Sequence, residues 1–154
     1  MMRFKWIDYD AETMDFVENW LDDSAVVTTG LDDGFLNFYR YWANEDGFSV
    51  GENFWCKVVF EGTEPFAVIA LAQNDKKITI MEIVVAPEKR GQGRGSKLLK
   101  ELHDCQEILG FSIDKSEAII FPCNAASQKA FENAGFRHFQ TYEDNSALIY
   151  IYEK

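Results

Sequence analysis

The sequence has little of several features that mark common protein classes. Of its 154 residues, three are proline and three are cysteine, and no Cys-x-x-Cys pair suggests a zinc site or a redox motif. No apolar run is long enough to span a bilayer, and the N-terminal residues turn acidic at once instead of forming a signal-peptide core. Scattered cysteines in an odd number fit reduced thiols, so we expect a cytoplasmic protein that has no membrane partner. Two separated histidines indicate no metal site.

Basic residues are also scarce, since the formal net charge is -11 at pH 7. General nucleic-acid binders and anionic-membrane binders rely on basic patches, so this charge argues against both kinds of partner. Disorder is excluded as well, because 47% of the residues are hydrophobic and 15% are aromatic. The length and composition therefore predict one domain over residues 1–154 with a core of its own.

Positive charge gathers at one glycine-rich segment of this acidic chain. Residues 84–99 read VVAPEKRGQGRGSKLL, which predicts a buried strand, a proline turn, alternating glycines and a helix. Glycines let backbone N–H groups approach a bulky anion, and a helix start directs unpaired N–H groups and a positive dipole end to the same place. Cations oppose the dipole there, so an anionic ligand explains them better than a solvated helix start. They are Lys89, Arg90, Arg94, Lys97 and Lys100.

Hydrophobic periodicity predicts an α/β (α+β) fold with a mixed central sheet of about six to seven strands and about four flanking helices. The element order is β-α-α-β-β-β-α-β-α-β-β, with 28–30 read as a turn. The expected elements are strand 4–7, a helix after Asp10, helix 32–44, strands 54–60, 66–73 and 78–85, helix 96–109, strand 117–122, helix 125–134, and strands 136–142 and 147–152.

The glycine spacing does not fit two common phosphate-binding loops. A Walker A loop, GxxxxGK[ST], started at Gly91 would need a second glycine at Ser96. A dinucleotide loop, GxGxxG, would need its third glycine at Ser96 or Leu98, and its strand would open a βαβ unit instead of following hairpins. A nucleotide-binding fold therefore stays only as a weaker alternative.

What remains at residues 90–95 is Arg-x-x-Gly-x-Gly, between a strand and an amphipathic helix. This pattern resembles the acyl-coenzyme A loop of the GNAT superfamily of N-acetyltransferases, Arg/Gln-x-x-Gly-x-Gly/Ala. Residues 124–136, Asn-x-x-Ser-x-x-x-Phe-x-x-x-Gly-Phe, resemble the second half of that family's domain, and the element order matches along the chain. The resemblance implies a GNAT-like fold that transfers an acetyl group from acetyl-CoA to a primary amine of a small molecule or peptide. The transfer would be a direct attack in a ternary complex without a metal.

The resemblance also implies which residues bind the coenzyme. Backbone N–H groups of 91–95 would bind the pyrophosphate, with Arg90 and Arg94 supplying charge at its edge. The strand before the loop splays from its neighbour in the family, so its backbone would pair with the pantetheine amides. Asn124 would reach the pantetheine arm, although Asn124 and Ser127 equally fit a helix N-cap and its following turn. The implied coenzyme-binding residues are Ile83, Val84, Val85, Arg90, Gly91, Gln92, Gly93, Arg94, Gly95, Ser96, Asn124, Ser127, Lys129 and Phe131.

Glu82 is the candidate catalytic base, because it is a carboxylate within an otherwise apolar strand. Alternation places Glu82 on one face of the strand with Val84, and burial there would raise its pKa toward a useful range. The alternative is an edge glutamate, or one that pairs with a cation on a neighbouring strand.

The usual general acid of the family is a tyrosine, and its position falls on Phe131, which has no hydroxyl. Three interpretations stay open. The thiolate leaves unaided, because a thiol has a pKa near ~8.5, or another group such as Tyr142, Cys123 or a water donates the proton. Otherwise the protein is a non-catalytic acyl-CoA-binding or interaction module.

The first two helices form part of the acceptor wall in this family. Here they carry many aromatic and acidic side chains, which suit a cationic amine on an apolar or sugar-like body, although helical spacing also fits simple core packing. The resemblance leaves open a homodimer. The aromatic residues of this region are Trp20, Phe35, Phe38, Tyr39, Tyr41 and Trp42, with Trp55 on the next strand, and the acidic ones are Asp22, Asp23, Asp32, Asp33, Glu45 and Asp46.

Overall fold

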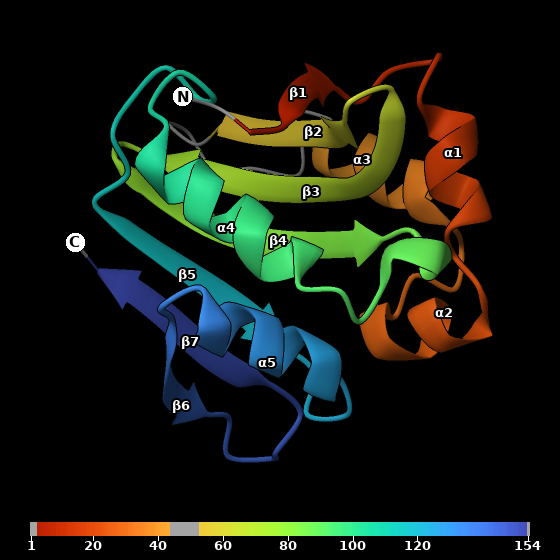
Figure 1. The fold of residues 1–154 in the computed structure, drawn as a ribbon. Coiled ribbons are helices and arrows are strands. Elements are labelled where there is room, and N and C mark those ends of the chain that lie inside the picture. The colour runs from red at the N-terminus through yellow and green to blue at the C-terminus, as the bar shows by residue number, and fades with distance from the viewer. Residues whose placement is uncertain (1–2, 44–52, 154) are drawn as a thin grey trace.

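The computed structural model describes residues 3–43 and 53–153. The elements are β1 (Lys5–Asp8), α1 (Met14–Asn19), α2 (Asp23–Thr29), α3 (Phe35–Ala43), β2 (Asn53–Glu61), β3 (Glu64–Asn74), β4 (Lys77–Val85), the 3-10 turn η2 (Pro87–Lys89), α4 (Arg94–Asp104), β5 (Lys115–Ile120), α5 (Ala125–Asn133), β6 (Arg137–Thr141) and β7 (Leu148–Glu153). The strands form one seven-stranded sheet in the order β1-β2-β3-β4-β5-β7-β6 (Figure 1). Neighbouring strands are antiparallel except β4 and β5, which run parallel.

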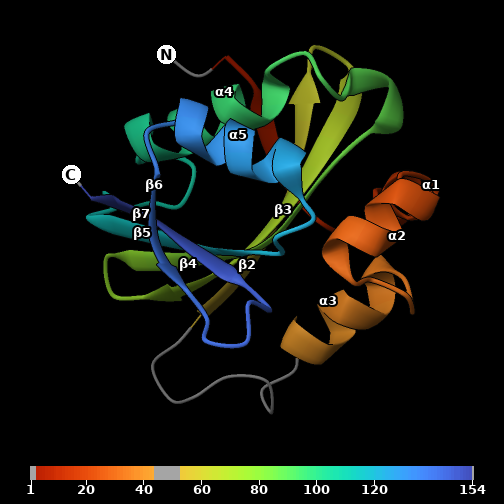
Figure 2. The ribbon, with the colours of Figure 1, turned by 90° about the horizontal axis from the view of Figure 1, so that it is seen from below.

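The helices cover the two faces of the sheet in separate groups (Figure 2). Helices α4 and α5 pack on one face through buried side chains such as Leu99. Helices α1 to α3 pack on the other face, where Phe35 is fully buried. Strand β3 serves both cores, because Ile69 faces the first and Val68 the second. Its near-continuous apolar sequence is typical of a strand that is buried on both faces.

The predicted mixed α/β fold is confirmed, with one helix more than expected. The turn predicted at 28–30 is wrong, because Thr28 and Thr29 end helix α2. This helix begins after the N-cap Asp22, whose side chain accepts a hydrogen bond from the Ala25 N–H, and ends at Gly30 in the left-handed conformation. Three helices therefore separate β1 from β2, and the molecule has five in its described residues. The helix predicted at 32–44 is α3, and residue 44 lies outside the described residues.

The pairing of β4 with β5 covers only part of either strand. Residues 77–80 lie opposite 115–118, and no pairing continues beyond them. The register between β3 and β4 shifts at the same place, which leaves Met81 as an extra, bulged residue. After the bulge, Glu82 shares a face with Val84, toward the α1–α3 core. The strands diverge here as the resemblance implied, and a gap opens in the middle of the sheet.

No helix in the described part of the chain is both long and apolar enough to cross a membrane.

Candidate functional site

The glycine loop after β4 leads directly into helix α4. Gly91 and Gly93 have φ values of +73° and +78°, a left-handed conformation that favours glycine. The first hydrogen bond of the helix runs from the Lys97 N–H to the Gly93 carbonyl at 3.2 Å. The N–H groups of residues 94–96 therefore have no partner within the helix. A Cβ on Gly91 or Gly93 would meet no atom within 4 Å, so the loop borders open space.

A glycine is required at position 95 for a different structural reason, the packing of two helices. The φ of Gly95 is not left-handed, and a Cβ there would lie 3.4 Å from the Cβ of Ala130 on α5. The missing side chain lets α4 and α5 approach closely, which closes one side of the space in front of the loop. Two of the three glycines thus shape the loop, and the third sets the packing of the helices.

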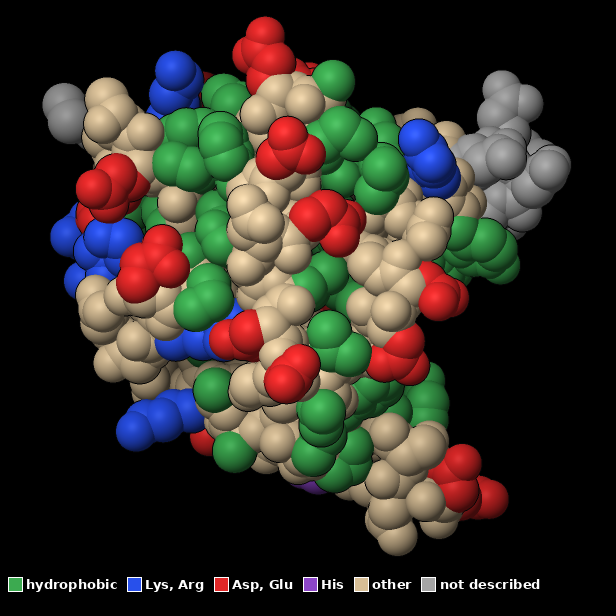
Figure 3. Space-filling view, turned by 90° about the vertical axis from the view of Figure 1, so that its right-hand side faces the viewer, with side chains coloured by type: hydrophobic (Ala, Val, Ile, Leu, Met, Phe, Trp, Pro, Cys, Tyr) green, Lys and Arg blue, Asp and Glu red, His purple; other side chains and the backbone are tan. Residues whose placement is uncertain are grey.

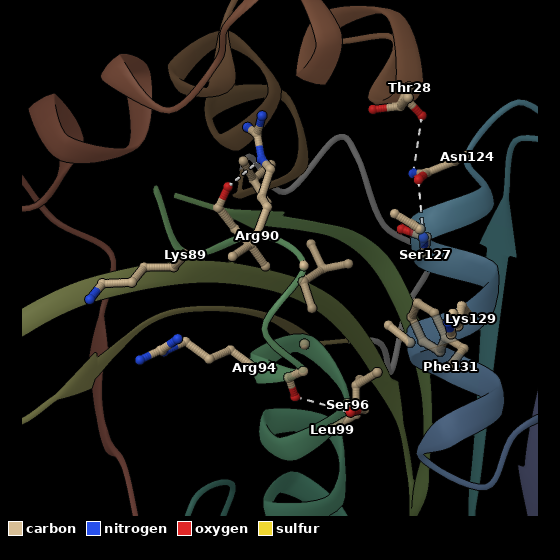
Figure 4. Close-up of a pocket in the computed structure, with 18 of the residues that line it drawn as sticks. Thr28, Lys89, Arg90, Arg94, Ser96, Leu99, Asn124, Ser127, Lys129 and Phe131 are labelled. Atoms are coloured by element: carbon tan, nitrogen blue, oxygen red, sulfur yellow. Dashed lines mark hydrogen bonds between the residues drawn. The ribbon is translucent and has the colours of Figure 1, made fainter. Parts of the chain in front are cut away.

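A cavity of about 360 Å³ lies between this loop, α2 and α5 (Figure 4). Of the predicted coenzyme-binding residues, Gln92 alone does not line it; its side chain is exposed and donates to the Glu88 carbonyl at 3.0 Å. The lining residues from the prediction are Ile83, Val84, Val85, Arg90, Gly91, Gly93, Arg94, Gly95, Ser96, Asn124, Ser127, Lys129 and Phe131. Two segments far apart in the sequence therefore border one cavity.

The basic side chains around the loop are largely paired with carboxylates. The ion pairs are Lys89 with Glu64 at 3.0 Å, Arg90 with Asp22 at 2.8 Å and Arg94 with Glu61 at 2.8 Å. The charge of these three side chains is therefore shared with carboxylates of β2, β3 and the α2 N-cap.

Arg90 joins the end of β4 to the segment between α1 and α2. Its Nε donates to the Val85 carbonyl at 3.0 Å, and its Nη2 donates to the Trp20 carbonyl at 3.0 Å. Its Nη1 contacts Asp22, the N-cap of α2. The hydrogen bond from the Ala25 N–H, followed by that from Arg90, lowers the pKa of Asp22. Figure 4 shows the Arg90 guanidinium directed toward the N-terminal helices, so in the structure Arg90 holds α2 against the loop.

Asn124 occupies the N-cap of α5. Its side-chain oxygen accepts a hydrogen bond from the Ser127 N–H at 3.1 Å, which is the capping geometry that the sequence analysis left open. Its amide nitrogen lies 3.5 Å from the Thr28 carbonyl at the end of α2 (Figure 4). The capping role does not remove Asn124 from the site, because it lines the cavity between the two helices.

A second cavity of about 420 Å³ lies beside the first, where β4 and β5 diverge. Glu82 lines this second cavity and not the first. The two cavities share lining residues from β4, α2 and α5, so they adjoin at the gap in the sheet. The shared residues are Thr28, Thr29, Ile83, Asn124, Ser127 and Phe131.

Glu82 is the titratable group with the most informative surroundings. Burial raises its pKa from the ordinary 4.5 to about 8, and the backbone N–H of Ile83 offsets this slightly. No described cation forms an ion pair with it. A carboxyl group with this pKa exchanges a proton near neutral pH, which is what a general base requires.

Phe131 is buried on α5 and packs edge-on against Phe136, with ring centroids 4.9 Å apart. It lines both cavities, whereas no tyrosine among the described residues lines either. Tyr142 and Cys123, the alternative proton donors, lie outside both linings. A water donor, an unaided thiolate and a non-catalytic module are the interpretations that remain.

The expected acceptor wall is smaller than the sequence suggested. Of its aromatic residues, Phe38 and Trp42 line the second cavity. Trp20 and Phe35 belong to the buried core. Tyr39, Tyr41 and Trp55 line neither cavity. None of Asp22, Asp23, Asp32 and Asp33 lines either cavity, and Glu45 and Asp46 fall outside the described residues. Sequence reasoning missed Ser24, Thr28, Thr29, Met81, Ile119 and Phe121.

Helix α2 explains several of these omissions. The run of β-branched residues at 26–29 has low helix propensity, so propensity alone hides the helix. Its end signals are nevertheless in the sequence: Asp22 as N-cap and Gly30 as the residue after the last turn. Reading the two together would have placed Thr28 and Thr29 on a helix that faces the loop.

The fold and the site together define a class of α/β protein. In this class a glycine loop with unpaired N–H groups borders one cavity, and a second cavity opens beside it where two strands of the sheet diverge. Among the described residues, no group of three or more His, Cys, Asp or Glu side chains could hold a metal ion. The chain belongs to the acetyltransferase (GNAT) family, whose family model matches residues 9–136. The protein is therefore an acyltransferase of a family that uses acetyl-CoA as co-substrate, as the sequence motifs predicted.

Solved structures of N-acetyltransferases share the fold. An aminoglycoside acetyltransferase in complex with coenzyme A is 15% identical, with a TM-score of 0.75 over 98% of this chain and 95% of that chain. Spermidine N-acetyltransferase from Vibrio cholerae, in complex with CoA and spermine, is 14% identical, with a TM-score of 0.70 over 98% and 95%. The ribosomal-protein-S18-alanine N-acetyltransferase from Escherichia coli is 15% identical, with a TM-score of 0.64 over 97% and 93%. No curated protein sequence gives a significant match.

Proposed function

We propose that the protein transfers an acetyl group from acetyl-CoA to a primary amine of a small molecule or peptide, by direct attack in a ternary complex. The observation that carries this proposal is the junction of the two cavities. One is bordered by the glycine loop and the other by Glu82, and both are bordered by Ile83 and Phe131. Two solved structures of the same fold contain coenzyme A, and one of them also contains spermine.

In this proposal the loop and β4 hold the coenzyme. The unpaired N–H groups of residues 94–96 and the dipole of α4 bind the pyrophosphate. The backbone of residues 81–84 does not pair with β5, so its groups on that edge are available for the amides of the pantetheine arm. An N–H group near Val84 or Val85 stabilises the thioester oxyanion as the amine attacks. Arg90 acts at a distance, by keeping α2 in place against the loop.

Glu82 accepts a proton from the ammonium group of the acceptor. The neutral amine nitrogen then attacks the thioester carbonyl carbon, a C–N bond forms, and the C–S bond breaks as the coenzyme thiolate leaves. The amide nitrogen loses its second proton, which goes to the thiolate directly or through solvent. Because a thiol has a pKa near ~8.5, the thiolate is a fair leaving group without a tyrosine donor. Phe131 then shields the thioester from bulk water.

The binding half of the proposal is tested with a matched pair of glycine variants. Gly93→Val and Gly110→Val both force a β-branched residue into a left-handed conformation with open space around it. Each should therefore lose about 1–2 kcal/mol of stability. We expect only Gly93→Val to weaken acetyl-CoA binding in calorimetry, by tenfold or more, because Gly110 lies between α4 and β5 and lines neither cavity. Equal affinity in the two variants would contradict the loop assignment.

A non-catalytic acyl-CoA-binding module is the alternative, and the absence of a tyrosine among the described cavity-lining residues favours it. Coenzyme binding without thiol release across a panel of primary amines would establish it. A cytoplasmic location is part of our proposal, supported by three free cysteines.

A further inference from the structure

The second cavity is lined by one acid, by eleven apolar residues and by five uncharged polar residues, Thr28, Thr29, Thr79, Asn124 and Ser127. Resting on the proposed function, we infer that the acceptor is a small molecule with one amine on a compact apolar or aromatic body. A polyamine or an aminoglycoside is therefore not the preferred acceptor. The chemistry of the cavity, the apolar side chains exposed beside it and its size support this inference.

Glu82 is the only titratable side chain among the described residues that line the second cavity. Around it lie aromatic rings from α3 and from the end of β5, including Phe38, Trp42 and Phe121, together with Met81. One carboxyl group can pair with one ammonium, whose approach favours the ionised form of the acid, and aromatic faces stabilise a cation beside them. A second or third ammonium of a polyamine would lose its water without gaining a carboxylate from the described lining residues.

The gap in the sheet also leaves large apolar side chains exposed. Ile119 is 43% exposed and Phe121 is 39% exposed, and both line the second cavity. They follow Ala118, the last residue of β5 that pairs with β4, so they lie beside the gap in the sheet. An apolar ligand body bound beside Glu82 would remove this surface from water, which is favourable. A sugar or a polyamine chain would gain less from this contact, because its own polar groups would lose water.

The size of the cavity and the charge around it are consistent with this class. A volume of about 420 Å³ is near the small end of the range for ligand sites. Figure 3 shows acidic side chains scattered across the face formed by the N-terminal helices, between hydrophobic ones, instead of gathered in one patch. Together with the net charge of -11, this arrangement attracts any cation, and the cavity lining then selects among them.

The test compares three amines: 2-phenylethylamine, spermidine and kanamycin. Each is titrated by calorimetry into the protein with and without CoA, and each is assayed for thiol release from acetyl-CoA. We expect 2-phenylethylamine to bind at least tenfold more tightly than the other two and to have a kcat/KM at least tenfold higher. Equal or tighter binding of spermidine or kanamycin, or binding of none of the three, would overturn the inference. Failure to bind CoA would instead contradict the proposed function.

Variants of exposed residues sharpen the result. Phe121→Ser should raise the KM for 2-phenylethylamine about tenfold and leave CoA affinity unchanged. Phe139→Ser is its matched control, because Phe139 is an exposed aromatic residue that lines neither cavity. Ile119→Asp adds a second carboxylate and should shift the preference toward spermidine by tenfold or more. If both cavity variants behave like the control, the acceptor body does not lie against β5 and the inference is wrong.

Discussion

Replacing Glu82 by glutamine should stabilise the protein, and the gain should grow with pH. The folded protein holds this carboxyl at a pKa of about 8, against 4.5 for the ordinary group. Between these two values the unfolded chain has lost the proton while the folded chain keeps it, so the wild type loses stability as pH rises through this window. Glutamine resembles the protonated side chain in shape and polarity but cannot ionise, so the variant avoids this loss.

The size of the effect follows from the two pKa values. Each pH unit inside the window contributes about 1.36 kcal/mol, so ionisation costs the wild type at most about 3 kcal/mol at pH 7 and about 5 kcal/mol at pH 9. The variant should match the wild type near pH 4.5 and exceed it progressively up to about pH 9. Above that pH both states of the wild type are ionised, and the difference should become constant.

Urea denaturation at pH 5, 7 and 9 measures the difference in the free energy of unfolding directly. Glu143→Gln is the control, because Glu143 is an exposed carboxylate in the turn between β6 and β7, and its variant should show no comparable rise with pH. A Glu82→Gln difference that stays flat from pH 5 to pH 9 would refute the argument that burial controls this group. The pH dependence of catalysis would then need another source.

Four further predictions concern catalysis, helix packing, the Arg90 contacts and the missing tyrosine. Glu82→Gln should also lower kcat/KM by about 100-fold or more, as expected for a lost general base, while calorimetry finds the same CoA affinity. Gly95→Val should destabilise the protein by about 1–3 kcal/mol through overpacking, and adding Ala130→Gly should restore part of this in urea unfolding; purely additive effects would contradict the packing role. Arg90→Lys keeps the charge but loses the three-point contact, so CoA affinity and Tm should fall nearly as far as in Arg90→Ala, and wild-type behaviour would show that charge alone matters. Phe131→Tyr should change kcat less than tenfold, and a 100-fold increase in thiol release would mean that a proton donor had been missing.

The parts of the site that the sequence could predict are local in the chain. The loop at 90–95 depends on φ values and N–H groups set by adjacent residues, so its glycine spacing carries the information. The same holds for the cap of α5, where Asn124 and Ser127 are three residues apart. The strand periodicity of β3 and β4 is local as well, which explains why the sheet was predicted with nearly the right bounds.

The parts that could not be predicted depend on contacts between distant segments. The partners of Arg90 lie at Trp20 and Asp22, and nothing near Arg90 in the sequence indicates them. The same applies to Gly95, because position 95 must be glycine to allow the close approach of Ala130 on another helix. The two sequence motifs therefore predicted most of the residues that border the first cavity. They did not predict which of those residues pack or tie the helices together and which are left without a partner in the protein.

The bulge at Met81 decides which cavity Glu82 serves. Strict alternation from Ile80 would put residue 82 on the same face as Ile80, in the core beneath α4 and α5. The extra residue reverses this, so that Glu82 pairs opposite Ala70 and turns toward the α1–α3 side. It does so at the point where β4 separates from β5, which is also where the two cavities adjoin. One inserted residue thus places the Glu82 side chain in the second cavity, while the next residue, Ile83, lines both cavities. In the proposed reaction, this arrangement puts the base on the acceptor side of the junction and the coenzyme on the other.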